Sequence, residues 1–211
     1  MNREYALILA WPETKCKQAG AWYDGLMEAL NFSNGGYYKV GHAAIVLINR
    51  FGTPYYFDFG RYHAPHGHGR VRDAHTDTDL ELKTSIEYAD SIPMNIDELI
   101  DELQNKKACH GDGNLACSLV AINFCKAYKK AKEMQNRVFI PYGPFVRNGT
   151  NCSRFVKSVA NKGIKSLRQK IILNLPPMLT PTPMWNVYAG KKQRSYEEDK
   201  SVIQEEEIIV A

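Results

Sequence analysis

Short apolar runs between turn-forming residues dominate the N-terminal part of the chain. Residues 5–10 form one such run, which Pro12 ends, and residues 41–48 form another. Apolar runs of this length predict buried β-strands. Residues 49–54 are typical of a turn and residues 55–59 favour a returning strand. The last two strands therefore predict an antiparallel hairpin.

Further along the chain, apolar residues recur at helical spacing. This spacing predicts helices over residues 17–30, 95–104, 115–135 and 151–161. The other segments are expected to be a loop over 61–79, a strand over 80–88, irregular proline-containing structure over 176–183 and an edge strand over 185–188. The mixture predicts an α+β fold. We expect one domain over residues 1–192 and a charged tail over residues 193–211.

Composition and charge narrow the class of protein. A length of 211 residues with 44% hydrophobic residues is typical of a single globular domain. The net charge is +4, but the positive residues are spread along the chain and no dense Lys/Arg block is present. Nucleic acid is therefore not an expected partner.

The cysteines and the apolar N-terminal run bear on location. The chain has five cysteines, an odd number, and none are spaced as a metal-binding pair. Residues 6–11 form an apolar run too short for a signal sequence or a membrane span. We expect a soluble cytoplasmic protein with reduced thiols, no membrane span, no metal and no cofactor.

Cys152 stands where a cysteine can be activated as a nucleophile. The segment Arg147–Phe155 is a polar, glycine-containing turn that leads into a helix, with Thr150 or Asn151 as the expected N-cap. A thiol in the first helical turn lies near backbone N–H groups and the positive end of the helix dipole, which favour the nucleophilic thiolate. The usual alternative is a small buried hydrophobic side chain. We expect Cys117 and Cys125 to be buried hydrophobic side chains of this kind, because they lie inside an apolar helical pattern.

A base and a group that orients it are found on the predicted hairpin. His42 begins the first strand directly after Gly41, and histidine is the usual base near neutral pH. Asp58 lies between aromatic residues on the returning strand, where a buried carboxylate needs a partner. We expect His42 within hydrogen-bonding reach of Cys152, and Asp58 as the acceptor for the imidazole. His63 is the alternative for this third role.

The predicted loop after the hairpin is rich in histidine and arginine. His63, His66 and His68 could bind a transition metal, but no cysteine or carboxylate stands at a metal-site spacing, so a polar loop is favoured. Arg61, Arg70 and Arg72 are suited either to an anionic group of a substrate or to solubility. Among the residues near the predicted site, we expect Arg61, Asn151 and His63 to contact substrate.

The motifs GHAAIVLI, YYFDF and NGTNCSRFV resemble those of the circularly permuted NlpC-type hydrolases of the papain-like superfamily. Lecithin retinol acyltransferase and its relatives belong to the same permuted group. The resemblance covers roughly residues 40–60 and 145–162. It implies an antiparallel central sheet packed against helices, with Cys152 as nucleophile, His42 as base and Asp58 as the third residue. The pair Ser153-Arg154 replaces the Glu-His that follows the cysteine in the acyltransferase branch, which argues against lipid chemistry.

The expected activity is therefore hydrolysis of an amide bond in a peptide or small amide, through a thioacyl intermediate on Cys152. Two alternatives remain open at this point. An acyltransferase or thioesterase of the same fold would need an apolar surface that docks on lipid, and none is evident from the sequence. A non-catalytic module would instead use the histidines for a metal or the arginines for an anion.

Overall fold

The computed structural model describes residues 3–17, 33–34, 37–38, 41–175, 180–190 and 193–195. Within them, a seven-stranded sheet has the order β11-β7-β6-β5-β1-β10-β12, and all neighbouring strands are antiparallel. These strands are β1 (Tyr5–Trp11), β5 (His42–Ile48), β6 (Pro54–Gly60), β7 (His68–Arg72), β10 (Ala116–Ala121), β11 (Ile140–Pro141) and β12 (Gln193–Ser195). The predicted α+β class with an antiparallel sheet is confirmed.

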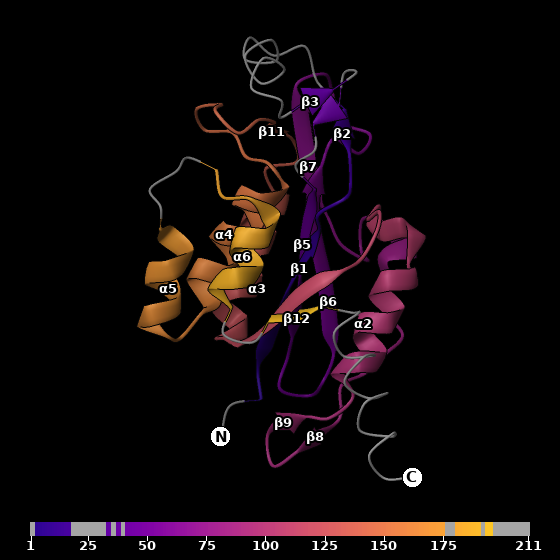
Figure 1. The fold of residues 1–211 in the computed structure, drawn as a ribbon, viewed down its shortest axis with the longest axis vertical. Coiled ribbons are helices and arrows are strands. Elements are labelled where there is room, and N and C mark those ends of the chain that lie inside the picture. The colour runs from indigo at the N-terminus through magenta and orange to yellow at the C-terminus, as the bar shows by residue number, and fades with distance from the viewer. Residues whose placement is uncertain are drawn as a thin grey trace.

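Helices cover both faces of the sheet (Figure 1). They are α2 (Ile96–Asn105), α3 (Phe124–Gln135), α4 (Cys152–Gly163), α5 (Leu167–Asn174) and α6 (Pro183–Ala189). Helices α3, α4 and α6 lie on one face with α5 outside them, and α2 lies on the other. No helix in the described part of the chain is long and apolar enough to cross a bilayer.

The remaining elements are short. They are a sheet of β2 (Cys16–Lys17), β4 (Tyr37–Tyr38) and β3 (Ser33–Asn34), a hairpin of β8 (Tyr88–Ala89) and β9 (Ile92–Pro93), and 3-10 turns at Thr78–Leu80 and Lys107–Cys109.

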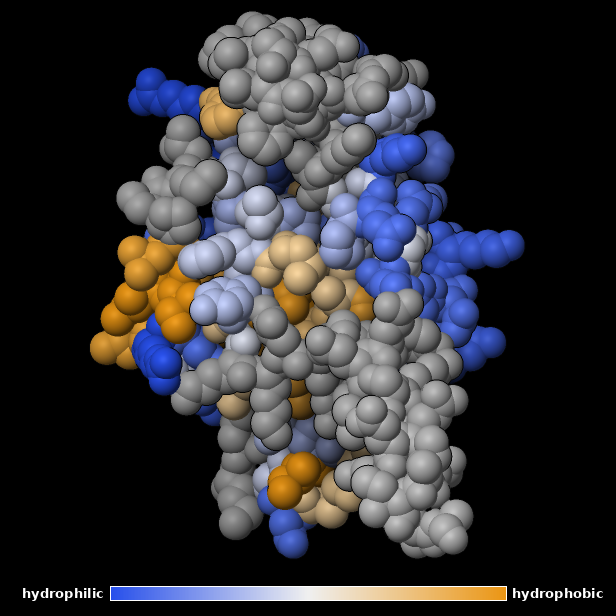
Figure 2. Space-filling model, viewed as in Figure 1, coloured by the Kyte–Doolittle hydropathy of each residue, from blue (hydrophilic) through white to orange (hydrophobic). Residues whose placement is uncertain are grey.

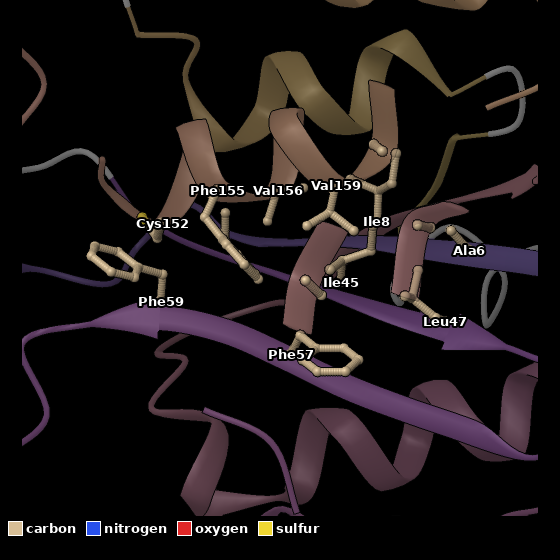
Figure 3. Packing of buried hydrophobic residues seen from close by; sticks show 14 of the residues in the cluster. Ala6, Ile8, Ile45, Leu47, Phe57, Phe59, Cys152, Phe155, Val156 and Val159 are labelled. Atoms are coloured by element: carbon tan, nitrogen blue, oxygen red, sulfur yellow. The ribbon is translucent and has the colours of Figure 1, made fainter. Parts of the chain in front are cut away.

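Alternation along the strands creates two apolar cores. In β5, Ile45 faces α4 and packs with Phe155 and Val159, as Figure 3 shows. Its neighbours Ala44 and Val46 face the opposite way, towards the cluster that contains the buried side of α2. Both faces of β5 are buried, which explains why its sequence is a continuous apolar run.

The predicted hairpin is confirmed, with β5 and β6 antiparallel and Ala44 opposite Asp58. The predicted helices at 95–104 and 151–161 are also confirmed as α2 and α4. Of the helix predicted over residues 17–30, Lys17 lies in β2 and the rest falls outside the described residues.

The continuous helix predicted over residues 115–135 is wrong in its first part. Residues Ala116–Ala121 form β10, a sheet strand between β1 and β12. A strand buried on both faces has no polar alternation, so its apolar residues can match a helical period equally well. Helix α3 begins only after Asn123, whose side chain accepts a hydrogen bond from the Lys126 N–H.

Three other local predictions also differ from the structure. The loop predicted over 61–79 contains β7, and of the strand predicted over 80–88 only Tyr88 is in a strand. The edge strand predicted over 185–188 is helix α6, because Thr182 caps it and Pro183 occupies its first turn. The three residues that begin the predicted tail form β12 against β10, and residues 196–211 fall outside the described residues.

Candidate active site

Helix α4 begins at Cys152, as the sequence predicts. Asn151 is its N-cap, and its side chain accepts a hydrogen bond from the Arg154 N–H at 2.9 Å. The first backbone hydrogen bond of the helix runs from Phe155 N to Asn151 O. The backbone N–H groups of Cys152 and Ser153 come before it and therefore take no part in the helical hydrogen bonds. The Cys152 side chain is only 6% exposed.

The backbone conformation of Gly41 sets the position of His42. Gly41 has φ +73°, and a Cβ there would lie 2.7 Å from the carbonyl oxygen of Trp11. Only glycine fits this turn without strain. His42 follows as the first residue of β5, opposite Trp11 in the sheet, and the two rings stack with centroids 5.9 Å apart. The imidazole therefore lies at the end of the sheet.

The imidazole of His42 joins the nucleophile to the carboxylate. The Cys152 thiol lies close enough to the His42 imidazole to raise its pKa, and His42 Nε2 lies 3.4 Å from Asp58 Oδ2, within ion-pair distance. Asp58 is opposite Ala44, and Ala44 is two residues beyond His42 on the same face of β5, so the register places the carboxylate diagonally beside the imidazole. These side chains form the chain Cys152–His42–Asp58.

Arg72 holds Asp58 from the other side. It stands opposite Asp58 on β7 and binds the carboxylate with two nitrogens, Nε to Oδ1 at 3.0 Å and Nη2 to Oδ2 at 2.6 Å. The hydroxyl groups of Tyr56 and Tyr62 also donate to Oδ2, at 3.1 and 3.4 Å. Asp58 is fully buried and Arg72 is 3% exposed, so this pair is a buried, bidentate salt bridge.

Electrostatics favour an imidazolium at neutral pH. Burial by itself lowers the pKa of His42, but hydrogen bonds with Asp58 and Cys152 outweigh it and raise that pKa to about 9. Burial acts to raise the pKa of Asp58, but hydrogen bonds with His42 and Arg72 outweigh it and lower that pKa. Asp58 therefore stays ionised between two cations.

The first turn of α4 is fastened by a contact from α6. Asn186 is fully buried, and its Nδ2 donates to the backbone oxygen of Ser153 at 2.9 Å and to the Ser153 hydroxyl at 2.8 Å. The next residue, Arg154, reaches the carbonyl oxygens of Gly143 and Val146 in the preceding loop, at 3.3 and 3.4 Å. Both residues after the nucleophile thus hold the helix start in place.

The other residues expected near the site have separate surroundings. Arg61 lies over the ring of Tyr142, 5.3 Å from its centroid. His63 is exposed, with φ +46°, in the loop after β6. Asn151 is used as the helix cap, as described. Contact of these three residues with substrate stays a prediction.

The arginines and histidines of this segment show no ready ligand site. Arg70 binds Asp77 through two nitrogens, at 2.7 and 2.6 Å, and Arg72 binds Asp58, so both are engaged inside the protein. No group of three or more histidine, cysteine, aspartate or glutamate side chains gathers to hold a metal ion in the described ranges.

Sequence reasoning missed the cation and the aromatic residues around Asp58. The sequence pattern suggests only substrate binding or solubility for Arg72, because it predicts a loop where the structure has β7. A usable signal was present: a buried carboxylate in a strand requires a cation or donors, and Arg72 is the last residue of HGRVR, whose alternation is that of a strand. Tyr56 could be found in a similar way, because it lies two residues before Asp58 and therefore on the same face of the strand.

Comparison with known proteins supplies the family. A family model described as "Type VI secretion system effector TseH-like" matches residues 6–169. Among solved structures, the chain is similar to the crystal structure of the type VI secretion system effector TseH, with 16% identity, 75% of each chain covered and a TM-score of 0.49. No curated protein sequence matches. Because the family model spans most of the chain, the protein belongs to the TseH-like family of type VI secretion system effectors.

Proposed function

We propose that this effector is a cysteine hydrolase that cleaves an amide bond, with Cys152 as nucleophile, His42 as general base and acid, and Asp58 as the residue that orients His42. The proposal rests on one observation: the His42 imidazole lies between Cys152 and Asp58 and interacts with both at the end of the sheet. His42 and Asp58 meet through one hairpin, and Cys152, far from both in the sequence, reaches them only because the fold brings α4 to the end of the sheet.

The reaction would proceed by acyl transfer to water. The Cys152 thiolate attacks the acyl carbon, and the His42 imidazolium protonates the leaving nitrogen as the carbon–nitrogen bond breaks. A water molecule then gives a proton to His42 and attacks the thioester, and the carbon–sulfur bond breaks to restore the thiolate. The Cys152 N–H at the start of α4 is suited to stabilise the oxyanion in both steps.

The order of the three residues agrees with the resemblance stated above. His42, then Asp58, then Cys152 is the order of the circularly permuted papain-like hydrolases, and we propose that permuted architecture for this chain. Delivery by secretion is implied by the family description. The cytoplasmic location expected from the sequence stays a prediction.

The test is amide cleavage by the purified full chain. A panel of peptides, small amides and peptidoglycan fragments is incubated with the protein, and newly released primary amines are measured by fluorescamine labelling and mass spectrometry. We expect release by the wild type and by the control Cys125→Ala, which alters an exposed thiol on α3. Cys152→Ala and His42→Ala should reduce release to background. Equal release by wild type and Cys152→Ala would show that Cys152 is not the nucleophile.

A further inference from the structure

Helix α5 carries an apolar stripe that faces away from the protein. Leu167 and Ile171 on the helix and Leu175 at its C-cap follow one another at intervals of four residues and are 73%, 53% and 51% exposed. Residues four apart lie on the same face of a helix. The opposite side of α5 is buried through Leu173. The stripe is therefore not the side through which α5 packs onto the rest of the protein.

Helix α6 extends this apolar surface. The indole Nε1–H of Trp185 donates to the Ile172 carbonyl oxygen at 3.2 Å, which ties α6 to α5. On α6, Met184 and Tyr188 are 39% and 58% exposed. Figure 2 shows hydrophobic atoms gathered at the place where α5 lies in Figure 1. We call the exposed side chains of Leu167, Ile171, Leu175, Met184 and Tyr188 the α5–α6 surface.

The segment of the chain that contains α5 and α6 carries charge of one sign. From residue 134 to residue 196 the sequence contains no aspartate or glutamate, and it contains eleven lysines and arginines. Arg168 is exposed on α5 itself, and Lys170 is half-buried beside the stripe. The rest of the chain has the opposite balance, because the whole protein carries only +4. An occupant of this surface must match apolar side chains on two helices whose only charged residues are the cations Arg168 and Lys170.

We propose that the α5–α6 surface docks on a bilayer that contains anionic phospholipids. The apolar stripe would enter the boundary between headgroups and acyl chains, and Arg168 and Lys170 would lie at the level of the phosphates. A second copy of this chain fits poorly, because pairing two such surfaces would bring positive charges together. Docking goes beyond the proposed hydrolysis and does not depend on it.

Vesicle binding by the full chain tests the docking. Protein is sedimented with large vesicles of phosphatidylcholine alone, or of phosphatidylcholine with an equal share of phosphatidylglycerol, at about 0.1 M salt. We expect sedimentation with the anionic vesicles and little with the neutral ones. The variant Leu167→Asp/Ile171→Asp should bind the anionic vesicles at least about tenfold more weakly. Arg168→Glu should reduce binding about fivefold.

The control is Ile92→Asp, which adds the same charge at a 63% exposed side chain on β9, away from α5. It should bind like the wild type. Because all the altered side chains are exposed, we expect the variants to fold, and thermal unfolding checks this. Binding of Leu167→Asp/Ile171→Asp equal to wild type, or no wild-type binding to anionic vesicles, would overturn the proposal. So would a wild-type dimer, seen by sedimentation velocity, that this variant abolishes.

Discussion

Asp58 has two partners, so its substitution has two separable effects. In Asp58→Asn the guanidinium of Arg72 stays 3% exposed but loses its anion. Breaking a buried ion pair from one side costs about 3–5 kcal/mol of unfolding free energy. Arg72→Met leaves Asp58 fully buried with His42 as its remaining cation, and we expect a loss in the same range. Methionine suits this position because its flexible side chain fills much of the space of arginine.

The double variant Asp58→Asn/Arg72→Met separates charge compensation from catalysis. It removes both charges of the pair, so neither is left buried without its partner. Its loss of unfolding free energy should therefore be smaller than the sum of the two single losses by at least about 2 kcal/mol. Its kcat should nevertheless stay low, roughly 100-fold below wild type, because His42 still lacks its carboxylate. In the double variant KM should change less than kcat.

The measurements are urea unfolding of all four proteins and steady-state kinetics on the best amide found in the panel. Losses of stability that simply add would show that Asp58 and Arg72 do not form a coupled pair. If the double variant regained wild-type kcat along with stability, Asp58 would serve only to neutralise Arg72, and its proposed role at His42 would be refuted.

The other predictions concern the nucleophile, the base and the positions around them. Cys152→Ala should lose all hydrolysis while urea unfolding changes by at most about 1–2 kcal/mol. The pKa of His42 is about 9 in the folded protein and 6.5 for an unperturbed histidine. Protonation of His42 therefore stabilises the fold fully below pH 6.5, and this contribution disappears as the pH rises through 9. His42→Gln should flatten the pH dependence of the unfolding free energy between these two values. Asn186→Ala removes the donor to Ser153 and should cost about 1–3 kcal/mol in urea unfolding. His63→Ala should leave kcat unchanged, and a large loss would assign it the role given to Asp58.

The sequence predicts the part of the site that depends on strong local signals. The glycine before His42 and the apolar run after it are sufficient to place the imidazole at a strand end. Hairpin pairing then brings Asp58 beside it, and the Asn-Cys pair marks the start of α4. Each of these inferences needs only neighbouring residues or one antiparallel pairing.

The parts that were missed depend on longer-range pairing. The partnership of Arg72 with Asp58 requires β7 to pair with β6, and the alternation of HGRVR indicates a strand without indicating which strand it pairs with. The strand β10 looks helical in sequence until its neighbours β1 and β12 are known. The hydrogen bond from Asn186 to Ser153 joins α6 to α4, and no local sequence pattern indicates that these two helices pack together.

The pH dependence of Cys152 alkylation tests the central claim most directly. Iodoacetamide is small enough for a side chain that is 6% exposed, and peptide mapping by mass spectrometry reads each cysteine separately. At pH 6 we expect Cys152 to be labelled faster than the exposed Cys125, because a neighbouring imidazolium and a helix N-terminus favour the nucleophilic form of a thiol. His42→Ala should remove this advantage. Labelling of Cys152 that is slower than that of Cys125 at pH 6 and unchanged in His42→Ala would contradict a catalytic Cys152–His42 pair.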